Sequence, residues 1–144
     1  MKKLLLLLII LIFSLNVNAQ INIDELNGQV YQFYDPDGKP VKPWGDRDNQ
    51  FYLFIKKGGN HGKMIGGHGS LPIEIFQLIE EGLSSKRLTD ATFTIKGNNL
   101  IIHGVHKDTL AVFNLSTKTF LIEGLGTMRL CDKLNIYKVN INDF

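Results

Sequence analysis

The chain has 144 residues, of which 44% are hydrophobic and 21% charged, and it carries 16 Lys and Arg against 14 Asp and Glu. This length suits one domain with a single core, and the apolar content excludes a wholly disordered chain. The small net charge excludes a nucleic-acid binder that acts through bulk positive charge.

The first 19 residues have the pattern of an export signal. Two lysines precede an unbroken apolar run over residues 4–13, and Val17 and Ala19 stand at the small-residue positions before the expected cleavage site. Because a bilayer-spanning helix requires about 20 apolar residues, this run predicts a cleaved leader rather than an anchor. The leader resembles the export signals of Bacteroidetes proteins, which implies a periplasmic or extracellular bacterial protein. We therefore expect one exported domain over residues 20–144, with no stable membrane insertion after cleavage.

The first half of this domain predicts two strands separated by a loop. Residues 20–26 read as a short lead-in, and the aromatic run 30–34 predicts the first strand. The Asp-Pro-Asp-Gly sequence at 35–38 predicts a turn, because Pro presets φ and Gly accepts a positive φ. Residues 39–50 have no periodicity and read as a loop, and 51–55 predicts a strongly apolar second strand.

A glycine-rich segment and a helix come next. Six of the twelve residues in 58–69 are glycine, which predicts a flexible connection, a pair of glycine-bent strand ends, or a lid over a binding site. Pro72 then opens a helix that Ser70 can cap, and an apolar stripe continues to Gly82. The helix should bury this stripe against a sheet.

The second half predicts an antiparallel meander. Strands are expected at 91–95, 100–105, 109–115 and 119–123, with short polar turns between them. Two glycines then break the pattern. The alternating segment 134–141 should close the sheet.

Six or seven antiparallel strands and one helix predict a mainly β (α+β) fold. The expected architecture is a strongly bent sheet or a partly open barrel, with the helix covering one face or plugging one end. The segment 26–31, with Gly28 two residues before Val30, is similar to the Gly-x-Trp start of lipocalin-like and calycin-like barrels, although Val30 stands where that family prefers Trp. A cystatin-like sheet around one helix is the alternative, but there the helix comes first.

Histidines are the main candidates for chemistry. His61 and His68 lie in the glycine-rich segment, and His103 and His106 lie at a strand end and in the following turn. Neutral imidazoles suit zinc or copper, so a site built from all four is one hypothesis, and four surface or loop histidines are the other. Neither Gly-x-Ser-x-Gly nor His-Glu-x-x-His occurs, so the sequence favours a non-enzymatic protein. The single cysteine, Cys131, reads as a small buried hydrophobe, with a nucleophile as the alternative.

The sequence therefore predicts an exported, non-enzymatic binding module for a small apolar molecule or a protein partner, with no obligatory cofactor. The predicted ligand-binding residues are Trp44, Tyr52, His61, Lys63 and His68. One alternative is a histidine-based metal-binding protein or a small metal-dependent enzyme. Another is an inhibitor or immunity-type protein that blocks a partner through an exposed loop.

Overall fold

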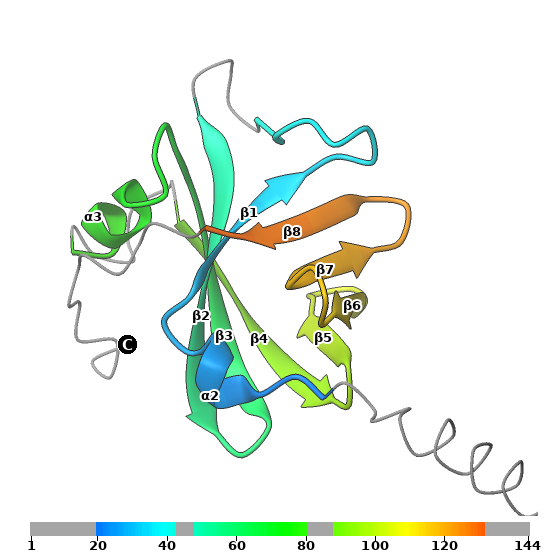
Figure 1. Ribbon diagram of the computed structural model, residues 1–144. Coiled ribbons are helices and arrows are strands. Elements are labelled where there is room, and N and C mark those ends of the chain that lie inside the picture. Colours follow the sequence, from blue (N-terminus) through cyan, green and yellow to red (C-terminus); the bar gives the residue numbers. More distant parts are fainter. Residues whose placement is uncertain (1–19, 43–47, 81–87, 132–144) are drawn as a thin grey trace, which may run out of the picture.

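The structure is a computed structural model that describes residues 20–42, 48–80 and 88–131. Eight antiparallel strands follow one another in sequence order and close into a barrel, because β1 pairs with both β2 and β8 (Figure 1). The strands are β1 (Val30–Tyr34), β2 (Asn49–Gly58), β3 (His61–Gly69), β4 (Leu88–Lys96), β5 (Asn99–His103), β6 (Thr109–Asn114), β7 (Thr119–Ile122) and β8 (Gly126–Leu130). The predicted mainly β fold and antiparallel meander are confirmed, and the barrel is closed rather than partly open.

The barrel is closed by a strand that the sequence analysis did not predict. The expected closing strand, 134–141, lies outside the described residues, and β8 fills the place between β7 and β1. The two glycines that were expected to break the sheet instead belong to the tight β7–β8 connection. Gly124 lies within the turn with a φ of 74°, and Gly126 begins β8 with a φ of 137°. A non-glycine residue rarely adopts such angles, so these glycines let the chain reverse within three residues.

Most of the glycine-rich segment is strand, which is closest to the expected pair of strand ends; the flexible connection and the lid are wrong for residues 61–69. β3 pairs with β2 on one side and with β4 on the other, and a two-residue turn at 59–60 joins it to β2. Its glycines leave room for neighbouring side chains. A Cβ atom at Gly62 would lie 2.2 Å from the ring of Phe93, and one at Gly66 would lie 2.8 Å from Oγ1 of Thr89. Close approach, rather than flexibility, accounts for these two glycines.

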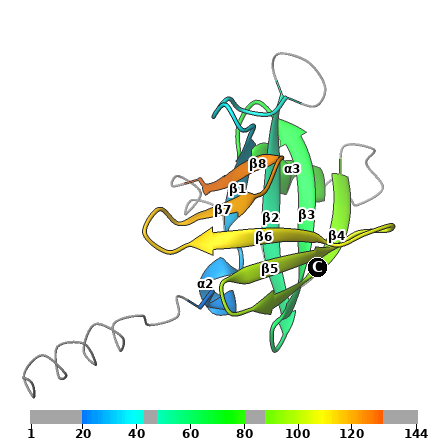
Figure 2. The ribbon, with the colours of Figure 1, turned by 90° about the vertical axis from the view of Figure 1, so that its right-hand side faces the viewer.

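The helix α3 (Glu74–Glu80) covers the outer face of the barrel wall, as expected. Figures 1 and 2 show it against β2 and β3, on the side away from β5 and β6. Its Ile75 and Phe76 join an outer core that contains Phe51, Leu53 and Ile55 of β2. The helix begins two residues after Pro72, and the backbone N–H of Ser70 donates to the Glu74 carboxylate at 3.0 Å. Its predicted end at Gly82 lies outside the described residues.

A second core fills the inside of the barrel. It holds the alternate face of β2, where the ring of Phe54 lies 5.3 Å from Tyr31 and 5.5 Å from Phe93, centroid to centroid. Phe120 continues the cluster, 5.3 Å from Tyr31. β2 is therefore buried on both faces, which explains why it has almost no polar alternation. Full burial of each phenylalanine side chain stabilises the fold by about 1.5–3 kcal/mol.

The expected lead-in at 20–26 contains a short helix, α2 (Ile23–Leu26), which plugs one end of the barrel. Asn22 caps it, with its side-chain oxygen 3.0 Å from the N–H of Asp24. Buried Ile23 and Leu26 join the inner core. A four-residue helix is too short to show a periodic pattern, which is why the sequence did not reveal it. Within the described ranges, neither helix has the length and apolar content to cross a bilayer.

Candidate functional site

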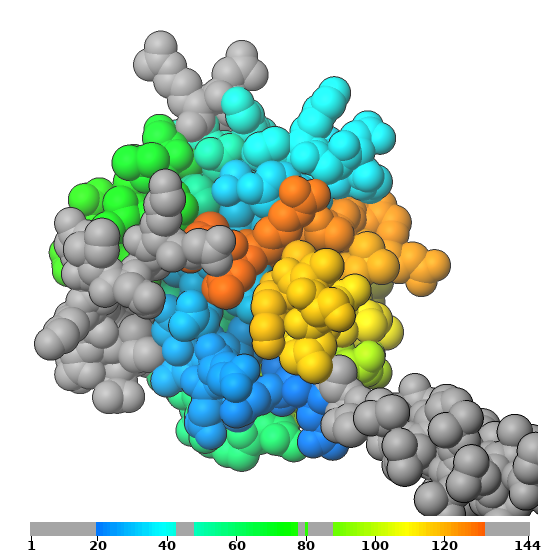
Figure 3. All heavy atoms as spheres, in the orientation of Figure 1, coloured from blue at the N-terminus to red at the C-terminus, as the bar shows by residue number. Residues whose placement is uncertain are grey.

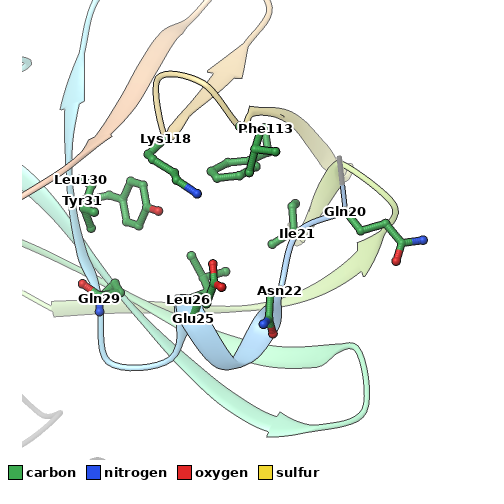
Figure 4. A pocket seen from close by; sticks show the side chains of 11 residues that line it. Gln20, Ile21, Asn22, Glu25, Leu26, Gln29, Tyr31, Phe113, Lys118 and Leu130 are labelled. Carbon is green, nitrogen blue, oxygen red and sulfur yellow. The ribbon is translucent and has the colours of Figure 1, made fainter. Parts of the chain in front are cut away.

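A pocket of about 190 Å³ opens at the end of the barrel that carries α2, and we call it the α2-end pocket. Three parts of the chain build it: the segment around α2 with the start of β1, the β6–β7 turn, and the end of β8. Figure 3 shows the yellow β6–β7 turn beside the blue α2 segment and the orange β8 on this face. The lining residues, drawn in Figure 4, are Gln20, Ile21, Asn22, Glu25, Leu26, Gln29, Tyr31, Phe113, Leu115, Lys118 and Leu130.

The floor of the α2-end pocket is apolar. Ile21 and Leu26 come from the plug, while Phe113 and Leu130 are partly buried side chains that pack against the inner core. The Phe113 ring lies 4.9 Å from that of Phe120, centroid to centroid. The pocket is thus the place where the aromatic core reaches the surface.

Tyr31 supplies a polar group to this apolar floor. Its side chain is only 4% exposed, and its hydroxyl has no hydrogen-bond partner in the part of the chain that the structure describes. In Figure 4 the hydroxyl points into the pocket. Burial, and secondarily the nearby charge of Glu25, raise the pKa of Tyr31 to about 12. The phenol therefore remains protonated at neutral pH and can donate a hydrogen bond to a ligand.

Two opposite charges reach into the same pocket. Glu25 comes from the first turn of α2, and Lys118 comes from the β6–β7 turn. Their charged ends point toward the pocket interior in Figure 4. Neither side chain has an ion-pair partner among residues 20–42, 48–80 and 88–131. Lys118 has a φ of 54° and is the one non-glycine residue of these ranges with a positive φ.

The predicted ligand-binding residues that the structure describes lie outside the α2-end pocket, and they are not all brought to one place. Tyr52 packs against the inner core with its ring 6.3 Å from that of Phe33, and burial raises its pKa. His68 contacts Asp48 through its Nδ1 atom at 3.1 Å. Trp44 lies outside the described residues.

The remaining two predicted ligand-binding residues, His61 and Lys63, line a shallow groove on the outer wall. This groove, about 720 Å³ in volume, runs over β3, β4 and β5, and we call it the Thr94 groove. Lys63 forms an ion pair with Asp90 at 2.8 Å. His61 and Lys63 therefore share one concavity in the structure, whose lining includes neither Tyr52 nor His68.

A series of four hydrogen-bonded side chains lies across the Thr94 groove. The Oγ1 atom of Thr94 lies 2.7 Å from Nε2 of His103 and 3.1 Å from Nδ1 of His61. The Nδ1 atom of His103 lies 3.3 Å from the Asp108 carboxylate. Because a carboxylate can only accept, His103 donates from Nδ1 to Asp108; in its neutral form His103 then accepts a hydrogen bond from the Thr94 hydroxyl at Nε2. The Thr94 oxygen then accepts from His61.

The hydrogen-bonded side chains Asp108, His103 and Thr94 have the order of groups found in acyl-transfer triads. Among the described residues, however, the backbone beside Thr94 is paired in the sheet. An enzyme of that class also stabilises the developing oxyanion with free N–H donors. Thr94 instead pairs with His61 of β3 and Ile101 of β5, so the sheet ladder occupies the backbone on both sides of it.

Two of the four histidines in the metal hypothesis lie close together. His61 and His103 meet at Thr94, while His68 lies on Asp48 and His106 lies in an exposed bend between β5 and β6. In the described ranges, no group of three His, Cys, Asp or Glu side chains is arranged to hold a metal ion.

Two further features of the surface bear on function. An apolar wall patch is formed by cross-strand neighbours, with Ile101 beside Leu110 and Val112 beside Leu121. Leu110 and Leu121 are 51% and 53% exposed. Cys131 packs against the outer core but is only half-buried, whereas the sequence predicted a small buried hydrophobe.

In comparisons with known proteins, no family model, curated protein or solved structure matches the chain. Function must therefore be inferred from its own residues. The sequence analysis missed Glu25, Tyr31 and Lys118 as site residues. No short motif links them, because they come from a plug, a strand and a turn that only the closed barrel brings together.

Proposed function

We propose that this chain is an exported, non-enzymatic binding protein that holds a small, partly apolar molecule in the α2-end pocket. The observation that carries the proposal is the Tyr31 hydroxyl. Tyr31 is a buried residue, but its hydroxyl faces an open pocket with an apolar floor and has no hydrogen-bond partner among the described residues. Because the pocket is open to solvent, a ligand that accepts this hydrogen bond replaces water, and such an exchange contributes about 0.5–1.5 kcal/mol. The export signal predicted over residues 1–19 is the basis for the exported location in this proposal.

The size of the pocket limits the ligand. A cavity of about 150 Å³ accommodates benzene, whereas drug-sized ligands occupy about 300–1,000 Å³. The α2-end pocket, at about 190 Å³, therefore suits a molecule somewhat larger than benzene. Long-chain lipids do not fit, and the aromatic rings of the inner core fill the space a lipid-binding barrel would keep open.

Native mass spectrometry of the chain purified from its own host tests this proposal. We expect a small bound mass in the wild type and none in Leu115→Trp, which places an indole at the rim of the pocket without entering the core. Leu110→Trp, on the wall patch, is the matched control and should retain the mass. Retention of the mass by Leu115→Trp would refute the site. A bound mass of protein size, lost in Leu121→Asp, would instead favour the protein partner expected from the sequence.

A further inference from the structure

We infer that the ligand of the α2-end pocket is a small zwitterion with an apolar side chain, such as an apolar α-amino acid. The inference rests on the proposed function and deepens it. Its basis is that a cation, Lys118, and an anion, Glu25, line one pocket with an apolar floor, and neither has an ion-pair partner in the part of the chain that the structure describes.

The two charges select the ligand by exclusion. A simple carboxylate is attracted by Lys118 and repelled by Glu25, and a simple amine meets the reverse. A neutral apolar molecule pairs with neither charge. Only a ligand with one group of each sign pairs with both side chains.

Tyr31 adds direction to this recognition. Its protonated hydroxyl projects from the wall on the same side of the pocket as Lys118 in Figure 4, and it can donate to a carboxylate oxygen. The ligand carboxylate is therefore placed between Lys118 and Tyr31, and its ammonium group faces Glu25. The side chain of the ligand then lies on Phe113 and Leu130.

The backbone of Lys118 is an independent observation in favour of this role. At a φ of 54°, glycine or asparagine is the residue that a turn ordinarily uses. The turn would therefore form more easily with glycine, so the feature that lysine contributes is its side chain. Strained backbone of this kind concentrates at binding sites.

Leucine and two truncated analogues give a direct test by isothermal titration calorimetry. Isocaproate is leucine without its ammonium group, and isoamylamine is leucine without its carboxylate. We expect leucine to bind up to about fivefold more tightly than either analogue, since Glu25 and Lys118 are exposed and a charge pair at exposed side chains is worth up to about 1 kcal/mol. Lys118→Gly should reduce leucine affinity to that of isoamylamine, and Glu25→Gln should reduce it to that of isocaproate.

The controls are Lys107→Gly and Glu123→Gln, which remove exposed charges at the opposite end of the barrel and should leave leucine binding unchanged. If isocaproate binds as tightly as leucine and Glu25→Gln has no effect, the zwitterion inference is wrong, while the proposed binding function stands. If none of the three probes binds and the host-purified chain carries no small mass, both proposals fail.

Discussion

Replacing Gly62 with alanine tests the packing of the glycine-rich strand. The added Cβ would lie 2.2 Å from Cζ and 2.5 Å from Cε1 of Phe93, and 2.6 Å from the backbone oxygen of Ile55. All three distances are far shorter than a carbon–carbon or carbon–oxygen contact of about 3.5 Å. Either the ring and the β2 backbone move, or β3 separates from its neighbours.

Neither partner can move at low cost. The Phe93 ring is only 1% exposed and is held edge-on against Phe54, so it has no empty space to enter. The Ile55 oxygen belongs to a strand that pairs with β3 itself. Overpacking of a core costs about 1–3 kcal/mol, and a clash that involves backbone belongs at the upper end. We expect Gly62→Ala to lower the free energy of unfolding by about 3 kcal/mol.

Urea unfolding followed by circular dichroism measures this loss. With an m-value of about 2 kcal/mol per M, the midpoint should fall by about 1.5 M. Gly58→Ala is the matched control on the same hairpin, because nothing lies within 4 Å of its added Cβ. It should shift stability by no more than about 0.5 kcal/mol. Equal midpoints for the two variants would refute the packed strand and return residues 61–69 to the loop that the sequence suggested.

Three other side chains have measurable effects on stability. Because the pKa of Tyr31 rises from 10.0 to about 12 on folding, the unfolded chain loses that proton first, so the unfolding free energy should hold below pH 9 and fall by about 2–3 kcal/mol between pH 10 and 12. Tyr31→Phe should remove this part of the decline in urea titrations at each pH. Lys118→Gly should raise the unfolding free energy by about 0.5–1 kcal/mol, because it relieves a positive φ; a lower melting temperature would contradict the strain. Thr94→Val should lower the free energy of unfolding by about 1–2 kcal/mol, because it removes the hydroxyl that hydrogen-bonds to two histidines. Thr92→Val, at an exposed position of the same strand, should change it by less than about 0.5 kcal/mol.

The elements that could be predicted are those with a local pattern. Val30–Tyr34 and Thr109–Asn114 are aromatic or β-branched and end in turn residues, and both form strands close to the expected bounds. The apolar stripe near residue 75 predicted the covering helix for the same reason. In these segments, propensity and burial agree, so one stretch of chain is enough to identify the element.

β3 could not be predicted because the contacts that stabilise it come from residues distant in the sequence. Glycine has no β propensity, and a segment that is half glycine gives no alternation. The space at Gly62 is required by Phe93, which follows 31 residues later in the sequence. Similarly, β8 follows a turn whose glycines are also typical of a chain that leaves a sheet. Only the pairing of β8 with β1 distinguishes a turn within the sheet from a segment that leaves it.

The position of the candidate site follows from how the aromatic residues are used. The sequence placed binding near Tyr52 because aromatic residues cover both faces of β2, and two apolar faces are consistent with either a core or a ligand cavity. The structure assigns both faces to packing, one beneath α3 and one inside the barrel. An aromatic side chain becomes available for binding where this packing ends. Tyr31 is at that boundary: its ring contacts Phe54 and Phe120, while its hydroxyl faces the α2-end pocket. A ligand that binds this hydroxyl therefore rests directly on the inner core, so its binding should stabilise the whole barrel rather than one loop.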